Sequence, residues 1–121
     1  MLRVDSRALD VEKGELIEAS ITKDRLDLLR EIDAIVMDEV FKAKLERDIW
    51  QFPVVLVPYG INKKESMVVR PVSSLEAMTA KFYPLPEEVL ESIIKNIESL
   101  KETSFIFYDV TNKPPGTIEW E

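Results

Sequence analysis

Two segments of the chain carry apolar residues at steps of three or four, the spacing of one helical face. In the first, which runs from Lys23 to about residue 45, a Thr22 cap and Asp24 in the first turn favour the helix, because both complement its free N–H groups. In the second, Pro86 suits the first helical position. The apolar stripes are Leu26, Leu29, Ile32, Ile35 and Val36 in the first helix, and Leu90, Ile93, Ile94, Ile97 and Leu100 in the second.

Runs of β-branched and aromatic residues predict strands between and after these helices. The predicted strands are "ELIEASIT" (15–22, short and weak), "FPVVLVPYG" (52–60), "MVVRPV" (67–72) and "SFIFYDV" (104–110). The polar segment "NKKES" (62–66) separates the second and third strands, so residues 52–72 are predicted to form a hairpin. After the hairpin, "SSLEAMT" (73–79) is predicted as a helical turn capped by Ser73 or Ser74.

The order of these elements is β-α-β-β-α-β, which predicts an α+β fold: a small antiparallel sheet of three to four strands with helices on one face. Residues 1–14 show no clear period and are expected to be an irregular lead-in to a domain at 15–121. In "VVLV" and "MVVR" both alternating sets of residues are largely apolar, so both faces of the sheet need cover. The second face is covered either by the chain itself or by a second subunit.

The composition of the chain limits the partners that it can bind and the cellular compartment that is expected. With 121 residues and a net charge of −7, the chain lacks the clustered cations that duplex nucleic acid or an anionic membrane surface requires. It has no apolar run near the length of about 18 residues that a membrane span needs. The N-terminal "MLRVDSRALDVEKG" lacks the apolar core of a signal peptide, and a cytoplasmic location is expected.

The chain has no cysteine and no histidine, which excludes thiol nucleophiles, Ser-His triads and thiolate or imidazole metal sites. Its glycines stand alone at Gly14, Gly60 and Gly116, so no glycine-rich phosphate loop can form. A self-sufficient enzyme is therefore not expected.

A few residues remain as candidates for binding. Arg70 lies within an apolar strand, where a guanidinium either reaches solvent from an edge strand or forms a fixed fork for a carboxylate or phosphate. At the C-terminus, "NKPPGTIEWE" (112–121) joins a lysine, a stiff Pro-Pro, a glycine and acids. Lys113 and Glu119 there are either solvated or anion- and sugar-binding groups, and Trp120 is either a core or an interface residue.

Taken together, these segments resemble one family, GMP synthase. The final "YDVTNKPPGTIEWE" (108–121) is similar to the family's C-terminal signature of Tyr-Asp-Ile and Lys-Pro-Pro-Ala-Thr-Ile-Glu. Three further segments resemble the family in the same order along the chain, so the resemblance covers residues 15–121. They are "ITKDRLDLLREIDAIVMDEV" (21–40), "DIWQFPVVLVP" (48–58) and "VVRPVSSLEAMTAKFYPLP" (68–86).

The resemblance implies a role in making GMP from XMP with ATP and ammonia. It covers only the C-terminal dimerisation domain, so ATP, Mg²⁺ and the catalytic loops belong to absent ATP-pyrophosphatase and glutaminase domains or subunits, and no cofactor is expected in this chain. The implied partners are a second copy of the chain, these catalytic domains and XMP.

Carried over position by position, the resemblance assigns XMP binding to Lys113, Thr117, Ile118 and Glu119 in the tail. It adds Gln51 of the Trp-Gln pair to the same site. It gives Arg70 a role at the dimer interface or in ordering the tail.

Three positions depart from the family pattern. Phe105 stands where the family has an arginine that helps bind nucleotide, Lys81 stands where an acid follows Met-Thr-Ala, and Leu16 replaces another arginine. A lost charge-assisted bond costs about 1.5–3 kcal/mol, or ten- to a hundredfold in affinity. The alternative is therefore a degenerate homodimeric interaction protein of the same fold that no longer binds nucleotide.

Overall fold

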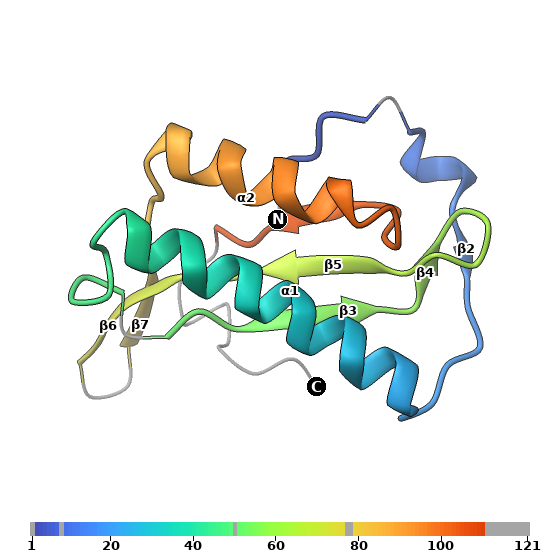
Figure 1. Ribbon diagram of the computed structural model, residues 1–121, viewed down its shortest axis with the longest axis horizontal. Coiled ribbons are helices and arrows are strands. Elements are labelled where there is room, and N and C mark those ends of the chain that lie inside the picture. Colours follow the sequence, from blue (N-terminus) through green and yellow to red (C-terminus); the bar gives the residue numbers. More distant parts are fainter. Residues whose placement is uncertain (1, 8, 50, 77–78, 111–121) are drawn as a thin grey trace.

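Two long helices pack on one side of a four-stranded sheet in the computed structural model, which describes residues 2–7, 9–49, 51–76 and 79–110. Helix α1 is Lys23–Lys42 and helix α2 is Glu87–Ser99. Figure 1 shows both in front of the sheet, side by side. The predicted α+β class, with helices on one face of a small sheet, is confirmed.

The main sheet has the strand order β1-β8-β5-β3. Strand β3 (Val54–Val57) pairs antiparallel with β5 (Ser66–Val69), which confirms the predicted hairpin. Strand β8 (Ile106–Tyr108) runs parallel to β5, so the sheet is mixed and the expectation of a purely antiparallel sheet was wrong. Parallel pairing is possible because the connection between β5 and β8 is long and contains α2, which returns the chain to the end of the sheet where β5 begins.

The lead-in expected at residues 1–14 contains structure. Strand β1 (Leu2–Arg3) pairs antiparallel with β8 at the edge of the sheet, and Val11–Lys13 forms one turn of 3₁₀ helix. Beyond β1, the Val4 amide donates to the Ile106 carbonyl at 2.8 Å, and Asp5 accepts from the Ile106 amide at 3.0 Å. A two-residue strand is too short to show an alternating pattern, and for this reason the sequence did not reveal it.

Two small two-stranded sheets flank the main one. Strand β2 (Glu15–Leu16) pairs with β4 (Tyr59–Gly60), which confirms a short strand within 15–22. Strands β6 (Val72–Glu76) and β7 (Thr79–Phe82) form an antiparallel hairpin at the left end of the view in Figure 1.

The helical turn predicted at 73–79 was therefore wrong. Pro71 restricts Arg70 to extended backbone, and the chain continues extended because Val72 donates to the Gln51 carbonyl at 2.7 Å. A helix of seven residues has little stability of its own, whereas the hairpin satisfies its backbone groups by local pairing. The backbone pairing of β6 with β7 therefore outweighs the helix-capping preference of Ser73 and Ser74.

Helix α1 begins as predicted. The Thr22 hydroxyl accepts from the Arg25 amide at 3.2 Å, and Asp24 lies in the first turn. The helix ends at Lys42, three residues before the predicted end, because Lys44 adopts a left-handed backbone with φ of 58°. Arg25 also binds Glu65 through both carboxylate oxygens at 2.7 and 2.8 Å, which ties the start of α1 to the start of β5 and raises the pKa of Arg25.

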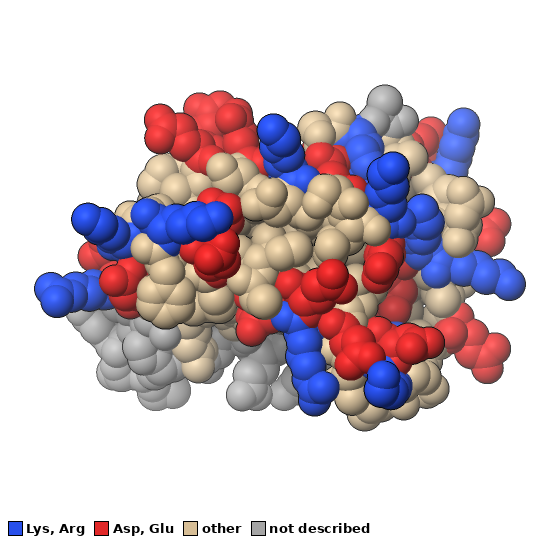
Figure 2. Space-filling view, viewed as in Figure 1, with Lys and Arg blue, Asp and Glu red and all other residues tan. Residues whose placement is uncertain are grey.

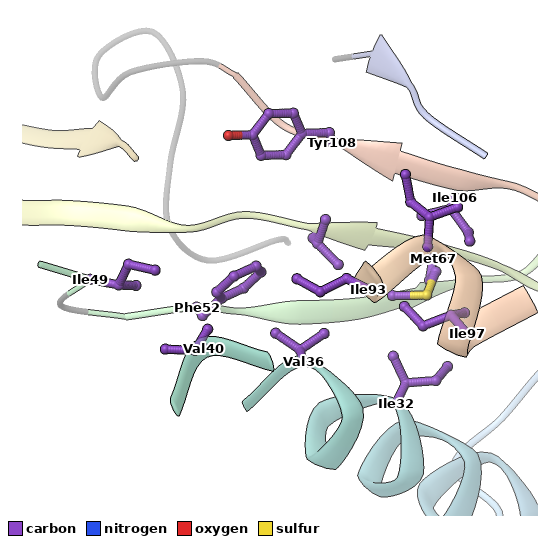
Figure 3. Close-up of a cluster of buried hydrophobic side chains, with 12 residues drawn as sticks. Ile32, Val36, Val40, Ile49, Phe52, Met67, Ile93, Ile97, Ile106 and Tyr108 are labelled. Atoms are coloured by element: carbon purple, nitrogen blue, oxygen red, sulfur yellow. The ribbon is translucent and has the colours of Figure 1, made fainter. Parts of the chain in front are cut away.

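The core lies between the helices and the near face of the sheet. Figure 3 shows Ile32, Val36 and Val40 projecting from α1 toward the side chains of α2 and the strands. The predicted stripe of α2 is confirmed, as are Ile32, Ile35 and Val36 of the α1 stripe. Leu26 was wrongly placed in the core, since it is 40% exposed, and Leu29 does not belong to the cluster either. Its members with the lowest exposure are Ile32, Val36, Val40, Met67, Val69, Ile93, Ile97 and Ile106.

The opposite face of the sheet is also apolar. Strand register places Val55, Val68 and Phe107 in one row across β3, β5 and β8. Val68 is buried, whereas Val55 and Phe107 are only half-buried. The structure therefore leaves part of this second face accessible in a single chain.

Candidate functional site

The topology brings Gln51, Arg70 and Asp109 to one end of the main sheet. Arg70 follows β5 and Asp109 follows β8, and the two parallel strands are in register at Val69 and Tyr108. Their carboxyl ends therefore meet at the same edge of the sheet. The chain continues from here toward residue 111, so this end of the sheet is also where the C-terminal stretch departs.

Arg70 and Asp109 form a buried ion pair. Arg70 Nη1 lies 3.0 Å from Asp109 Oδ2, and the two side chains are 1% and 3% exposed. Backbone bonds fix both residues, since the Arg70 amide donates to the Pro53 carbonyl and the Asp109 amide to the Val69 carbonyl, each at 3.0 Å. Of the two readings of Arg70, the fixed fork for a carboxylate is correct, and the carboxylate is supplied by the chain itself.

Gln51 lies beside this pair on the strand that enters β3. It forms an isolated antiparallel bridge with Val72, and the residue is exposed. Its backbone is therefore held in the sheet while the residue remains accessible to a ligand. Its role in nucleotide binding stays a prediction.

Tyr108 links the same end of the sheet to the segment after the β6–β7 hairpin. Its buried phenol donates to the Tyr83 carbonyl at 2.7 Å and accepts from the Leu85 amide at 3.0 Å. Its ring meets the Phe82 ring edge-on, with centroids 6.5 Å apart. Burial raises the pKa of Tyr108 above its usual value, because the ionised phenolate would lose hydration.

Replacing Tyr108 by phenylalanine is expected to lower the free energy of unfolding by about 1–3 kcal/mol, because two partly buried backbone groups lose their partner. The wild-type phenol also makes stability depend on pH. Since the folded-state pKa is raised, its contribution is complete below about pH 10 and is lost as the pH rises through the folded pKa. Urea denaturation between pH 7 and 11 should show a smaller alkaline loss in Tyr108→Phe than in wild type. Parallel curves would contradict this assignment.

The other predicted site residues fall in the C-terminal stretch. Lys113, Thr117, Ile118 and Glu119 lie outside the described residues, so their roles stay predictions. The described part of the chain ends at Val110, directly after the Arg70–Asp109 pair. The pair therefore fixes the backbone at residue 109, four residues before Lys113 in the sequence.

The three departures from the family pattern have different surroundings. Phe105 is fully buried, and the Arg3 guanidinium lies 4.9 Å from the centroid of its ring. Leu16 is 86% exposed in β2. Lys81 lies in β7. The position of the expected arginine is thus occupied by an aromatic ring that packs inside the domain.

Sequence reasoning missed Asp109 and Tyr108 as parts of this site. A signal existed for Asp109, because an arginine inside an apolar strand needs a buried acid and "SFIFYDV" contains one acid. No comparable signal marked Tyr108, since its partners are backbone groups of a segment distant in sequence.

Within the described ranges, no three metal-ligating side chains come together to form a candidate metal site. In the same part of the chain, no helix is both long enough and apolar enough to cross a membrane.

Comparison with known proteins adds the following matches. The chain matches the family described as GMP synthase C terminal domain over residues 38–120. It is 50% identical over 96 residues to a protein named probable GMP synthase (glutamine-hydrolyzing) from Leptospira interrogans, covering 78% of this chain and 16% of that protein. It is 48% and 47% identical over 118 residues to the GMP synthases (glutamine-hydrolyzing) of Streptomyces coelicolor and Bifidobacterium longum, covering 89% of this chain. The chain spans 16% to 22% of the length of these relatives.

Proposed function

Because the chain belongs to the GMP synthase C-terminal domain family, we propose that it is the XMP-binding and dimerisation domain of a GMP synthase. The observation that carries this proposal is the sequence of the terminal stretch from Lys113 to Glu119, which resembles the family signature, together with the family match over residues 38–120. In this account Lys113 and neighbouring backbone amides bind the phosphate of XMP, and Thr117 and Ile118 belong to the same binding stretch. Glu119 accepts hydrogen bonds from the nucleotide, and the Gln51 amide donates to it or accepts from it.

The domain does not catalyse by itself in this proposal. It acts with an ATP-pyrophosphatase and a glutaminase, either as domains of one chain or as separate subunits, and these bind ATP and Mg²⁺. The composition supports the assignment of catalysis to these other domains, because the chain has neither a cysteine nor a histidine to act as a catalytic residue. A cytoplasmic setting, where purine nucleotides are made, fits the same reading.

We propose homodimerisation through the second face of the sheet. The helix-bearing face is covered with interspersed acidic and basic side chains, as Figure 2 shows, and is suited to water. The second face instead carries the half-buried Val55 and Phe107 beside Val68. Apolar surface of this kind is stabilised when a second copy covers it.

Sedimentation velocity tests the dimer. Wild type is expected to sediment as a dimer at micromolar concentration, and Phe107→Lys as a monomer, because a buried unpaired charge opposes association. Phe41→Lys is the matched control, since Phe41 is exposed on α1 and lies away from the proposed interface. Circular dichroism verifies that each variant is folded. A folded Phe107→Lys variant that remains a dimer would overturn this choice of interface.

Thermal denaturation tests ligand binding. If XMP binds only the folded state, a concentration one hundred times the dissociation constant adds about 2.7 kcal/mol of stability and raises the melting temperature by several degrees. Ribose 5-phosphate at the same concentration controls for binding of the phosphate alone. An unchanged melting temperature with XMP would contradict nucleotide binding.

One observation favours the alternative of a degenerate homodimeric interaction protein. Phe105 and the Arg3 guanidinium form a cation–π contact, and Arg3 also binds Asp5 at 2.9 Å, so its charge is already compensated. Position 105 therefore provides no uncompensated cation that could bind a nucleotide phosphate. The alternative expects a dimer in sedimentation and no response to XMP.

A further inference from the structure

A second cleft lies at the other end of the sheet, where β5 and β8 begin. It lies between the turn joining β4 to β5, the end of α2 and the N-terminal segment, toward the right of the view in Figure 1, and has a volume of about 450 Å³. This volume is within the range of small-molecule pockets. The polar and charged residues that line it are Arg7, Asn62, Lys64, Glu98, Lys101, Thr103 and Ser104.

The charge of this cleft is positive, although the chain as a whole carries −7. The single acid among its lining residues, Glu98, is already compensated: it pairs with Arg7 at 3.1 Å and accepts from the Ser6 amide at 3.2 Å. Within the described ranges, Lys64 and Lys101 have no ion-pair partner. Two uncompensated ammonium groups that line the cleft, Lys64 on the turn between β4 and β5 and Lys101 after α2, therefore remain available to an anion.

Thr103 supplies a second, independent sign of a ligand. The residue is 1% exposed, lines the cleft, and its hydroxyl has no hydrogen-bond partner within the described ranges. A buried hydroxyl without a partner is destabilising, and such groups call for an explanation such as a bound molecule. A ligand oxygen reached by a change of the Thr103 side-chain rotamer would satisfy it.

The walls of the cleft are held in place by backbone contacts. The Ser104 hydroxyl donates to the Lys64 carbonyl at 2.5 Å and accepts from the Ile61 amide at 2.9 Å, which fixes the turn to the start of β8. Arg7 donates to the Ser104 carbonyl at 2.6 Å from the other side. Asn62 and Lys101 adopt left-handed backbones with φ of 55° and 58°, a conformation that costs energy in residues with side chains. The turn that carries Lys64 is thus held by hydrogen bonds of Ser104, and the Lys101 backbone is held to the end of α2 by its amide, which donates to the Glu98 carbonyl at 3.1 Å.

We propose that this cleft binds the phosphate group of a small phosphate ester. A phosphate presents several acceptor oxygens, enough to accept from Lys64, Lys101 and the hydroxyl of Thr103, which line the same cleft. The remaining volume accommodates the organic part of the ester against the apolar side chains of Leu9 and Ile61. This site is separate from the proposed XMP site, since it lies where β8 begins and the C-terminal stretch departs where β8 ends.

Amide NMR titration of the full chain tests the proposal, with inorganic phosphate, glycerol 3-phosphate and acetate at matched ionic strength as probes. Saturable shifts at the amides of Asn62, Lys64 and Thr103 are expected with both phosphates, and weaker shifts with acetate. Tighter binding of glycerol 3-phosphate identifies an ester site, and equal binding identifies a site for free phosphate. Uniform shifts with all three probes, or none, would overturn the proposal.

The variants Lys64→Ala and Lys101→Ala should each weaken phosphate binding about tenfold, because each removes one charge-assisted contact. Thr103→Val retains the shape of the side chain and should also weaken binding. Lys63→Ala is the matched control, since Lys63 is adjacent and exposed but lines a different cleft, with Glu15 and Glu18. If Lys101 serves only to compensate the negative end of α2, its removal lowers stability without changing phosphate binding, and the proposal fails.

Discussion

Replacing Arg70 by methionine is expected to lower the free energy of unfolding by about 3–5 kcal/mol, because the buried Asp109 carboxylate then loses its guanidinium partner. That loss is a large share of the roughly 5–15 kcal/mol that stabilises a typical domain. The two side chains are 1% and 3% exposed, so water cannot substitute for the missing charge. Urea denaturation at pH 7 measures the change.

Arg30→Met is the matched control for this prediction. Arg30 carries the same side chain on α1 but is 77% exposed and lies 3.9 Å from Asp27, so the same substitution there should change stability by about 0.5 kcal/mol or less. An equal effect of the two substitutions would show that the Arg70–Asp109 pair does not behave as a buried one.

The double variant Arg70→Met, Asp109→Leu separates stability from function. Removing both charges leaves no uncompensated group, so most of the lost stability should return. If Arg70 also orders the C-terminal stretch, XMP binding should remain weakened in this stable double variant. Recovery of both stability and XMP binding would assign the pair a purely structural role.

The helices and the main hairpin could be predicted because their signals are local. The stripe of α2 and the C-terminal part of the α1 stripe, from Ile32 to Val36, lie in one core, and the Thr22 cap is at the predicted position. In "FPVVLVPYG" and "MVVRPV" a dense β-branched pattern with a polar turn between them was sufficient to predict pairing. In each case the residues that carry the signal also make the contacts.

The features that escaped prediction depend on contacts between distant segments. Strand β1 exists because Val4 and Asp5 meet Ile106 about one hundred residues later. The β6–β7 hairpin replaced a helical turn because Val72 pairs with Gln51. Asp109 became part of the site only when the parallel pairing of β5 and β8 placed it beside Arg70.

The second large effect is expected at Lys113. If its ammonium group binds the XMP phosphate, Lys113→Ala should weaken XMP binding by about ten- to a hundredfold, because one charge-assisted contact is worth about 1.5–3 kcal/mol. The stability of the domain should change little. Lys63→Ala provides the control for a general effect of net charge, since Lys63 is exposed and lies on the turn between β4 and β5.

Calorimetric titration of XMP into the purified chain, repeated with Lys113→Ala and Lys63→Ala, tests the central claim most directly. The account predicts saturable binding with one site per chain, unchanged in Lys63→Ala and weakened at least about tenfold in Lys113→Ala. Absence of binding heat in wild type at several temperatures, or equal affinity in wild type and Lys113→Ala, would contradict it.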